Sequence, residues 1–168
     1  RRSNINMYQI VATEHTGFDL IGPLITTSWG MYGCALLSTF VCQLIGVMWF
    51  GKIFNETFVE SMKKLRGEKT FKAVERKGYP ISYSVLISFL SAFVTAVGSL
   101  VILQALNIQT LGSSLTLGAT LWVAMKVTEV ESAVWQGLPL PLIAITHAKS
   151  LVCTLFHFAF LFCCLHLR

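Results

Sequence analysis

Charged residues are scarce in this chain of 168 residues, and the shortage limits what the chain can be. Only 12% of the residues are Asp, Glu, Lys or Arg, whereas 54% are hydrophobic. The length allows one domain, without room for a separate catalytic domain beside it. Although the net charge is +5, nucleic-acid binding is not indicated, because no basic and aromatic pattern of a nucleic-acid-binding fold accompanies it.

The chain also lacks the motifs of common enzymes and of metal sites. No Ser-His-Asp arrangement, HExxH pair or Gly-rich phosphate loop occurs in a suitable context. The cysteines are odd in number and form no CxxC pair, which argues against a complete disulfide framework; a buried free cysteine acts mainly as a small hydrophobic side chain. We therefore expect no catalytic residue, no metal ligand and no cofactor. The cysteines are Cys34, Cys42, Cys153, Cys163 and Cys164.

What the chain has in quantity is long apolar sequence. A bilayer core about 30 Å thick needs roughly 20 apolar residues per spanning helix, and four stretches approach or exceed that length, at about residues 29–50, 81–106, 110–128 and 142–167. They predict an all-α, polytopic membrane protein, with a four-helix transmembrane bundle in residues 29–168. Residues 1–28 predict a polar N-terminal extension. Its Arg1-Arg2-Ser3 start fits an organelle protein whose targeting segment has been removed, and it fits equally a chain whose first residues lie further upstream.

The basic residues predict how the bundle is oriented. Eight of the thirteen Lys and Arg residues lie between Lys52 and Lys77, and connections rich in Lys and Arg stay on the side from which a membrane protein is inserted. We therefore place this connection and the third connection, at about Glu129–Pro141, on the inner side, and both termini on the outer side. The second connection, Asn107-Ile108-Gln109, is so short that it predicts spans two and three to be antiparallel neighbours.

The first part of the basic connection predicts a helix of its own. Apolar Phe58, Val59, Met62 and Leu65 recur at helical spacing, and Gly67 ends the pattern. We interpret residues 55–66 as an interfacial amphipathic helix with its apolar face at the lipid boundary; packing of this face on a neighbouring subunit is the alternative. The candidates for contact with anionic lipid headgroups or with a partner protein are Lys52, Lys63, Lys64 and Arg66.

Aromatic and small residues indicate where the spans meet the headgroups and each other. Trp29, Trp49 and Trp135 lie near predicted span ends, where indole rings favour headgroup depth, so we interpret them as interface anchors rather than as an aromatic cage. Small residues four positions apart permit close contact between helices. Such pairs are Ala92 and Ala96, Ser114 and Gly118, and Ala144 and Ala148.

Lys149 is the costliest residue to bury, since it lies about seven residues, or roughly 10 Å, inside the fourth span. An ionisable side chain at this depth marks a functional site by default. Glu129 follows the third span on the same side, and His147 is close in the sequence. The three residues form a candidate intramembrane polar site in which Lys149 and Glu129 pair. The alternative is a lysine that snorkels to the inner headgroups.

The histidines offer another hypothesis. His147 and His157 are ten residues apart in the sequence, hence about 15 Å apart along a helix, so they cannot ligate one metal together. A single axial ligand to a haem or a pigment is possible in principle. An isolated histidine in a membrane helix more often bonds a neighbouring carbonyl oxygen.

Three segments, taken in order, carry a resemblance to a known family. Together they cover about residues 35–167 and resemble the family catalogued as domain of unknown function 1761. The resemblance implies a small four-span membrane protein and names no reaction, so no catalytic residue is carried over. Where the family has a glycine, an acid and a basic residue, this chain has Asn55, Gln136 and Leu138. The segments are Gly46-Val47-Met48-Trp49-Phe50-Gly51-Lys52-Ile53-Phe54-Asn55 with Phe58, Leu115-Thr116-Leu117-Gly118-Ala119-Thr120-Leu121-Trp122, and Trp135-Gln136-Gly137-Leu138-Pro139-Leu140.

Two functions from different classes follow. The first is a non-catalytic accessory or structural subunit of a larger membrane complex of the respiratory or ATP synthase type, with the mitochondrial inner membrane favoured. Its partners would be other subunits and membrane lipids with anionic headgroups. The second is a small transporter or proton-conducting membrane protein that uses Lys149, Glu129 and His147. Attachment of a haem or a pigment through His147 or His157 comes third.

Overall fold

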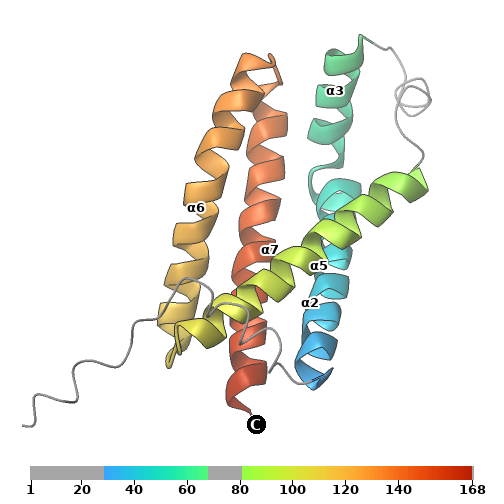
Figure 1. Ribbon diagram of the computed structural model, residues 1–168. Helices are drawn as coiled ribbons and strands as arrows, with labels where there is room; N and C mark the ends of the chain where they lie inside the picture. Colours follow the sequence, from blue (N-terminus) through green and yellow to red (C-terminus); the bar gives the residue numbers. More distant parts are fainter. Residues whose placement is uncertain (1–28, 68–80, 168) are drawn as a thin grey trace, which may run out of the picture.

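The structure, a computed structural model, describes residues 29–67 and 81–167, and these residues form helices joined by short turns (Figure 1). No strand occurs in the described ranges, and the all-α prediction is confirmed. The predicted extension at residues 1–28 and the second half of the basic connection, residues 68–80, lie outside them. In chain order the elements are α2 (Trp29–Met48), the π-helix η2 (Trp49–Ile53), α3 (Asn55–Arg66), α5 (Ile81–Ala105), α6 (Leu111–Trp135) and α7 (Leu140–His166).

Among the described residues, three helices are long and apolar enough to cross a membrane. They cover Trp29–Ile53, Tyr83–Ala105 and Leu140–His166, which is consistent with a multi-pass membrane protein. Helix α6 has 25 residues but is not among the three, and its C-terminal half contains Lys126, Glu129 and Glu131. The prediction that α6 is a fourth span therefore stays a prediction.

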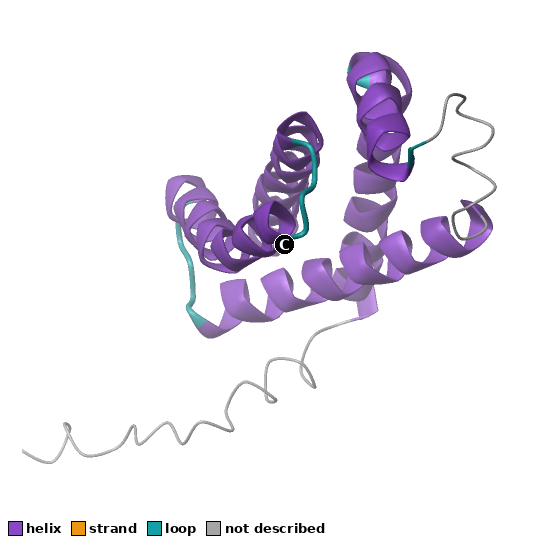
Figure 2. Ribbon diagram, turned by 90° about the horizontal axis from the view of Figure 1, so that it is seen from above, coloured by secondary structure: helices purple, strands orange, loops and turns teal. Residues whose placement is uncertain are grey.

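Helix α7 is the centre of the arrangement. It packs against α2, α5 and α6, and its N-terminal part also contacts α3. Figures 1 and 2 show α5 crossing the other helices obliquely, whereas α6 runs beside α7. The prediction that spans two and three pack as neighbours is wrong, because α5 and α6 diverge from their short connection. A short loop fixes only where two helices meet; the direction of α5 is set by its contacts with α2 and α7.

Residues in the left-handed conformation end three of the helices. Asn107 (φ 47°), Gly67 (φ 63°) and Gly137 (φ 69°) each follow the last turn. At Gly137 the next amide, that of Leu138, donates to the carbonyl oxygen of Ala133 at 3.0 Å, which is the hydrogen bond of a Schellman motif. The predicted third connection, at about Glu129–Pro141, is helical in its first part, since α6 continues to Trp135 and the turn is only residues 136–139.

The predicted helix in the basic connection is present at the predicted residues, as α3. Its direction continues that of α2 rather than turning across the bundle (Figure 1). Five residues of π-helix separate the two, with the amide of Phe54 bonded to the carbonyl oxygen of Trp49 at 2.8 Å. Phe58, Val59 and Met62 are half-buried, and α3 contacts α7. Placement of α3 in the lipid interface stays a prediction.

The tightest packing lies in the half of the bundle that contains the C-terminus, which we call the outer half. Here the ring of Phe158 lies so close to Gly118 that a β-carbon on Gly118 would approach its Cδ2 to 2.8 Å. One turn away, the hydroxyl of Ser114 donates to the carbonyl oxygen of Phe158 at 2.9 Å. The buried apolar core of this half is formed by Met31, Ala35, Ala96, Leu100, Leu103, Phe158 and Leu161.

The small-residue pairs divide into two groups. Ser114 and Gly118 are buried where α6 meets α7, and Ala96 is buried in the core, so close contact at these positions is confirmed. Ala144 and Ala148 are exposed. The prediction is wrong for this pair within the described part of the chain, because no described helix covers that face of α7.

Candidate functional site

A cavity of about 180 Å³ lies between α5, α6 and α7; we call it the central cavity. Its walls carry hydroxyl, ammonium, thiol and imidazole groups, an unusual set for helices this apolar. Helix α6 contributes Lys126, α5 contributes Ser88, Ser91, Ala92 and Thr95, and α7 contributes Lys149, Ser150, Cys153, Thr154 and His157.

The position of the central cavity is the middle of the helices. Cys153 is the middle residue of α7, Leu140–His166, and Phe93, the middle residue of α5, lies between the cavity-lining Ala92 and Thr95. On α5 the lining residues recur at helical spacing, which puts them on one face. The space exists because α5 crosses α7 obliquely and leaves α6, so that this face of α5 meets α7 without closing against α6.

Lys149 lies on the wall of this cavity rather than in an ion pair. A β-carbon built on Gly46 would lie 3.2 Å from Cε and 3.6 Å from Nζ of Lys149, so the lysine side chain rests against the bare backbone of α2. Its ammonium makes no ion pair with any acid that the structure describes. The predicted pair of Lys149 with Glu129 is wrong, because Lys126 reaches Glu129 first from one turn earlier on the same helix.

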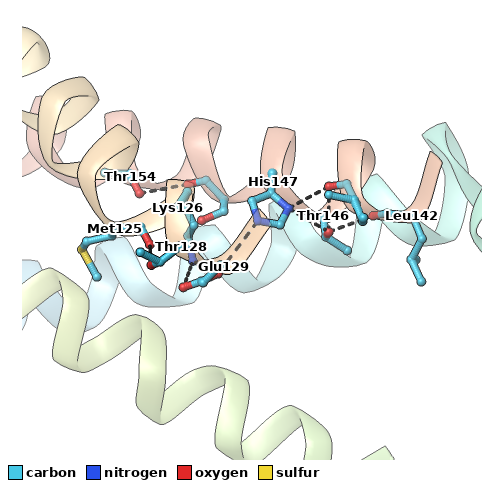
Figure 3. Close-up of polar contacts among 10 residues, drawn as sticks. Met125, Lys126, Thr128, Glu129, Leu142, Thr146, His147 and Thr154 are labelled. Carbon is cyan, nitrogen blue, oxygen red and sulfur yellow. Dashed lines mark hydrogen bonds and ion pairs between the residues drawn. The ribbon is translucent and has the colours of Figure 1, made fainter. Parts of the chain in front are cut away.

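Lys126, Glu129 and His147 form a polar cluster where α6 meets α7 (Figure 3). The ammonium of Lys126 donates to both carboxylate oxygens of Glu129, at 2.6 and 2.7 Å. Nε2 of His147 lies 4.0 Å from the same carboxylate. Nδ1 of His147 lies 2.8 Å from the carbonyl oxygen of Ile143; a carbonyl only accepts, so Nδ1 carries the hydrogen. Nε2 is then the ring nitrogen that faces Glu129, and it is buried without a hydrogen bond to the described residues.

The structure therefore connects the three predicted polar residues indirectly. Glu129 and His147 face each other. Lys126, which was not among the predicted site residues, joins Glu129 to the wall of the central cavity that also holds Lys149. The hydroxyl residues were missed as well. Their signal was present in the sequence, because Ser88, Ser91 and Thr95 recur at intervals of three and four residues within an apolar helix.

His157 is buried, and its Nδ1 lies 2.7 Å from the hydroxyl of Ser38 on α2. Nε2 is the ring nitrogen left for the central cavity, which His157 lines. Among the described residues no group of three His, Cys, Asp or Glu side chains is placed to hold a metal ion. The nearby thiols of Cys42 and Cys153 each lie within 3.9 Å of the other residue's carbonyl oxygen, and both are free cysteines.

A second and larger pocket adjoins the central cavity. Its volume is about 560 Å³, and the described residues that line it lie on α5. It extends from Tyr83, in the first turn of this helix, to Ser88 and Ser91, which it shares with the central cavity. This second pocket is an open groove on the surface of α5.

The predicted surface residues have mixed surroundings. Lys52 and Lys64 are exposed and Lys63 is half-buried, whereas of Arg66 the structure describes only the backbone at the end of α3. Contact of these cations with headgroups stays a prediction.

The three tryptophans also differ. Trp29 and Trp135, at opposite ends of the bundle, are 90% and 83% exposed. Trp49 is half-buried, and its indole donates to the carbonyl oxygen of Ile145 at 2.9 Å. Trp49 thereby ties the π-helix to α7, a role that its position at a span end did not suggest.

Comparison of the sequence with known protein families gives one match. The family model described as "Protein of unknown function (DUF1761)" matches residues 34–161. This range begins in α2 and ends in α7, so it includes every residue that lines the central cavity. No curated protein and no solved structure matches the chain.

Proposed function

The chain belongs to this family of unknown function, and from that premise we propose that it is a small membrane transport protein that moves a small polar solute or ion through the central cavity. The observation that carries the proposal is the cavity itself. It gathers lysine, serine, threonine and histidine side chains at the middle of long apolar helices. Polar groups at membrane depth are costly and typically line substrate or ion pathways, and transporters commonly bind their substrates near the bilayer midplane.

In this proposal α6 is the fourth span. Its 25 residues match the length of α5, and it runs beside α7 (Figure 1). The ion pair between Lys126 and Glu129 supports this placement, since each charge reduces the cost of burying the other. The even number of spans then returns both ends of the bundle to the outer side, as the distribution of basic residues predicts.

The residues have separate roles in the proposed transport. Lys149 contacts the solute in the central cavity, which is reached from the inner side along the second pocket. Glu129 and His147 accept and release a proton at the inner part of the bundle, since Nε2 of His147 lies 4.0 Å from the carboxylate of Glu129. Lys126 connects these two steps, because it bonds Glu129 and lines the cavity.

A flux experiment tests the proposal. The purified chain is reconstituted in liposomes, and the permeation of small cations, anions and neutral polar solutes is followed by light scattering and ion-sensitive dyes. We expect at least one solute to pass faster than in protein-free liposomes, and Lys149→Gln to reduce that rate. Lys64→Gln, which removes an exposed lysine of α3, is the control and should leave the rate unchanged. Permeation equal to that of empty liposomes for every solute would reject the proposal.

An accessory subunit of a larger membrane complex is the second candidate. The exposed Ala144 and Ala148 favour it, since small residues four positions apart on an uncovered helix face can accept a partner helix. Under this candidate the mitochondrial inner membrane is the predicted location. Native purification in mild detergent followed by mass measurement decides the question, because a chain that migrates alone at 18.6 kDa plus detergent is not a stoichiometric subunit.

A further inference from the structure

We infer that the central cavity takes a small monovalent anion, with the ammonium of Lys149 as its counter-ion. The inference rests on the proposed function, because it names the class of solute that the same cavity would carry. Three observations support it: the charge balance of the cavity wall, the hydroxyl groups on that wall that are still able to donate a hydrogen bond, and the volume of the cavity.

The charge balance leaves one positive charge without a partner. Lys126 and Lys149 both line the cavity, but the carboxylate of Glu129 binds only Lys126, at 2.6 Å. No Asp or Glu lies among the described residues of the wall. An ammonium group at membrane depth without a counter-ion is costly, and a bound anion reduces that cost. Because one ammonium group is unpaired, the complementary solute carries a single negative charge.

The hydroxyl groups of the wall differ in what they offer. Those of Thr95 and Thr154 each donate to the carbonyl oxygen four residues earlier, at 2.9 Å. Ser88 shares a 3.4 Å contact with Gln43. Ser91 and Ser150 make no side-chain hydrogen bond to the described residues, so their hydroxyl hydrogens remain available. These serines come from α5 and α7, and both line the cavity with Lys149.

The volume is large enough for a small anion. At about 180 Å³ the cavity has room for several water molecules, since one water needs only about 10–15 Å³ of such space. A halide ion or a short-chain carboxylate with part of its water shell satisfies both the size and the charge. The two share the chemistry of a compact monovalent acceptor of hydrogen bonds, and the experiment separates them.

The test measures binding apart from transport. The full chain is placed in nanodiscs of phosphatidylcholine, which has no net charge, and its thermal unfolding is recorded in sodium chloride, sodium acetate and sodium gluconate at one ionic strength. We expect a saturable rise in Tm with chloride, with acetate or with both, and none with bulky gluconate, because a ligand of the folded state stabilises it. Lys149→Gln should weaken the apparent affinity about tenfold or more, the loss expected for one charged hydrogen bond. Lys64→Gln is the matched control and should bind as the wild type does.

A second variant keeps the inference testable if Lys149→Gln does not fold. Gly46→Ala retains every charge but puts a methyl group 3.2 Å from the present position of Cε of Lys149. The end of the lysine side chain must then shift by a few tenths of an ångström, and the anion should bind more weakly. Gly33→Ala, on the same helix with nothing within 4 Å, is its control.

The outcomes distinguish the inference from the proposed function. Equal Tm values in the three salts, or undiminished affinity in both Lys149→Gln and Gly46→Ala, would overturn the inference. Anion binding without flux would leave the inference standing and reject transport. If only cations or neutral solutes permeate, the proposed transport function stands, and the inference that the cavity takes an anion is rejected.

Discussion

The outer half of the bundle and the central cavity are built from the same helices but differ in the side chains that these helices bring together. In the outer half, α2, α5 and α7 meet through apolar side chains, and α6 meets α7 through Gly118 and Phe158 with no space between them. At the cavity, only a few turns away, the same α5 and α7 present hydroxyl and charged groups to a space of about 180 Å³. The contacts of the packed half therefore hold together the same helices that line the cavity.

The comparison predicts that stability and binding reside in different halves. Substitutions in the outer half should lower the free energy of unfolding with little direct effect on an anion. Substitutions at the cavity should change anion affinity while the chain stays folded. Each of the following experiments tests whether stability and anion binding depend on different residues.

The largest effect is expected from Phe158→Ala. Phe158 is 2% exposed and lies in the core cluster, and truncating a buried phenylalanine typically costs about 3–5 kcal/mol through lost contacts and the cavity left behind. Thermal or denaturant unfolding in detergent measures the change. Phe40→Ala, which truncates a side chain that is 56% exposed, is the control and should cost much less. Equal losses at the two positions would mean that the outer half is not a packed core.

Gly118→Ala should come next, with a loss of about 1–3 kcal/mol from overpacking. The added β-carbon would lie 2.8 Å from the ring of Phe158, and a buried ring cannot shift without opening the contact between α6 and α7. Gly98→Ala is the control, since no atom lies within 4 Å of a β-carbon built on Gly98. It should be neutral or should stabilise the fold by up to about 1 kcal/mol, because alanine has a higher helix propensity than glycine. A loss of unfolding free energy in Gly118→Ala but not in Gly98→Ala would support the close contact between Gly118 and Phe158. Similar changes in the two variants would contradict it.

Ser38→Ala tests the boundary between the halves. The hydroxyl of Ser38 lies 2.7 Å from Nδ1 of the buried His157, and its removal leaves a polar ring atom without a partner, at a cost of about 1–3 kcal/mol. Because His157 also lines the central cavity, anion affinity should fall in the same variant. Thr116→Ala, at an exposed position of α6 that lines neither pocket, should lower neither quantity. A loss of stability without any change in affinity would assign His157 to the packed half alone.

Local signals explain what could be predicted from the sequence. The helix at residues 55–66 was predicted with its bounds, because an apolar stripe and Gly67 are both local features, and Gly67 has the φ of 63° that such an end requires. The end of helix α6 could not be predicted in the same way, because the charged Glu129 and Glu131 indicate the end of a span and not the end of the helix. The ion pair with Lys126 instead supports the helix there, and Gly137 supplies its end.

The central cavity depends on features that are not local. Its existence requires α5 to cross α7 and to diverge from α6, and the loop of residues 107–109 does not specify that direction. The stripe of Ser88, Ser91 and Thr95 was readable in the sequence, but only the packing of α5 on α7 brings it to Lys149. The partner of Glu129 also depends on the distance between side chains. Lys126 lies one turn away on the same helix and forms the ion pair, whereas Lys149 lies on another helix.

The smallest expected effect comes from Glu129→Gln. Unlike the other variants at the cavity, it should raise the affinity for the anion. Glu129 is 52% exposed, so loss of its ion pair should cost at most about 1 kcal/mol of stability. The change leaves Lys126 unneutralised on the cavity wall and adds a positive charge to the site, which should strengthen chloride or acetate binding by about fivefold if the added attraction is about 1 kcal/mol. Glu131→Gln removes an exposed acid two residues away and should leave the affinity within twofold, given that exposed charges are screened. Titrations of both variants in nanodiscs measure the difference. Weaker binding in Glu129→Gln would mean that the carboxylate holds Lys126 in place for the anion, and the cavity would then need the acid as much as the two lysines.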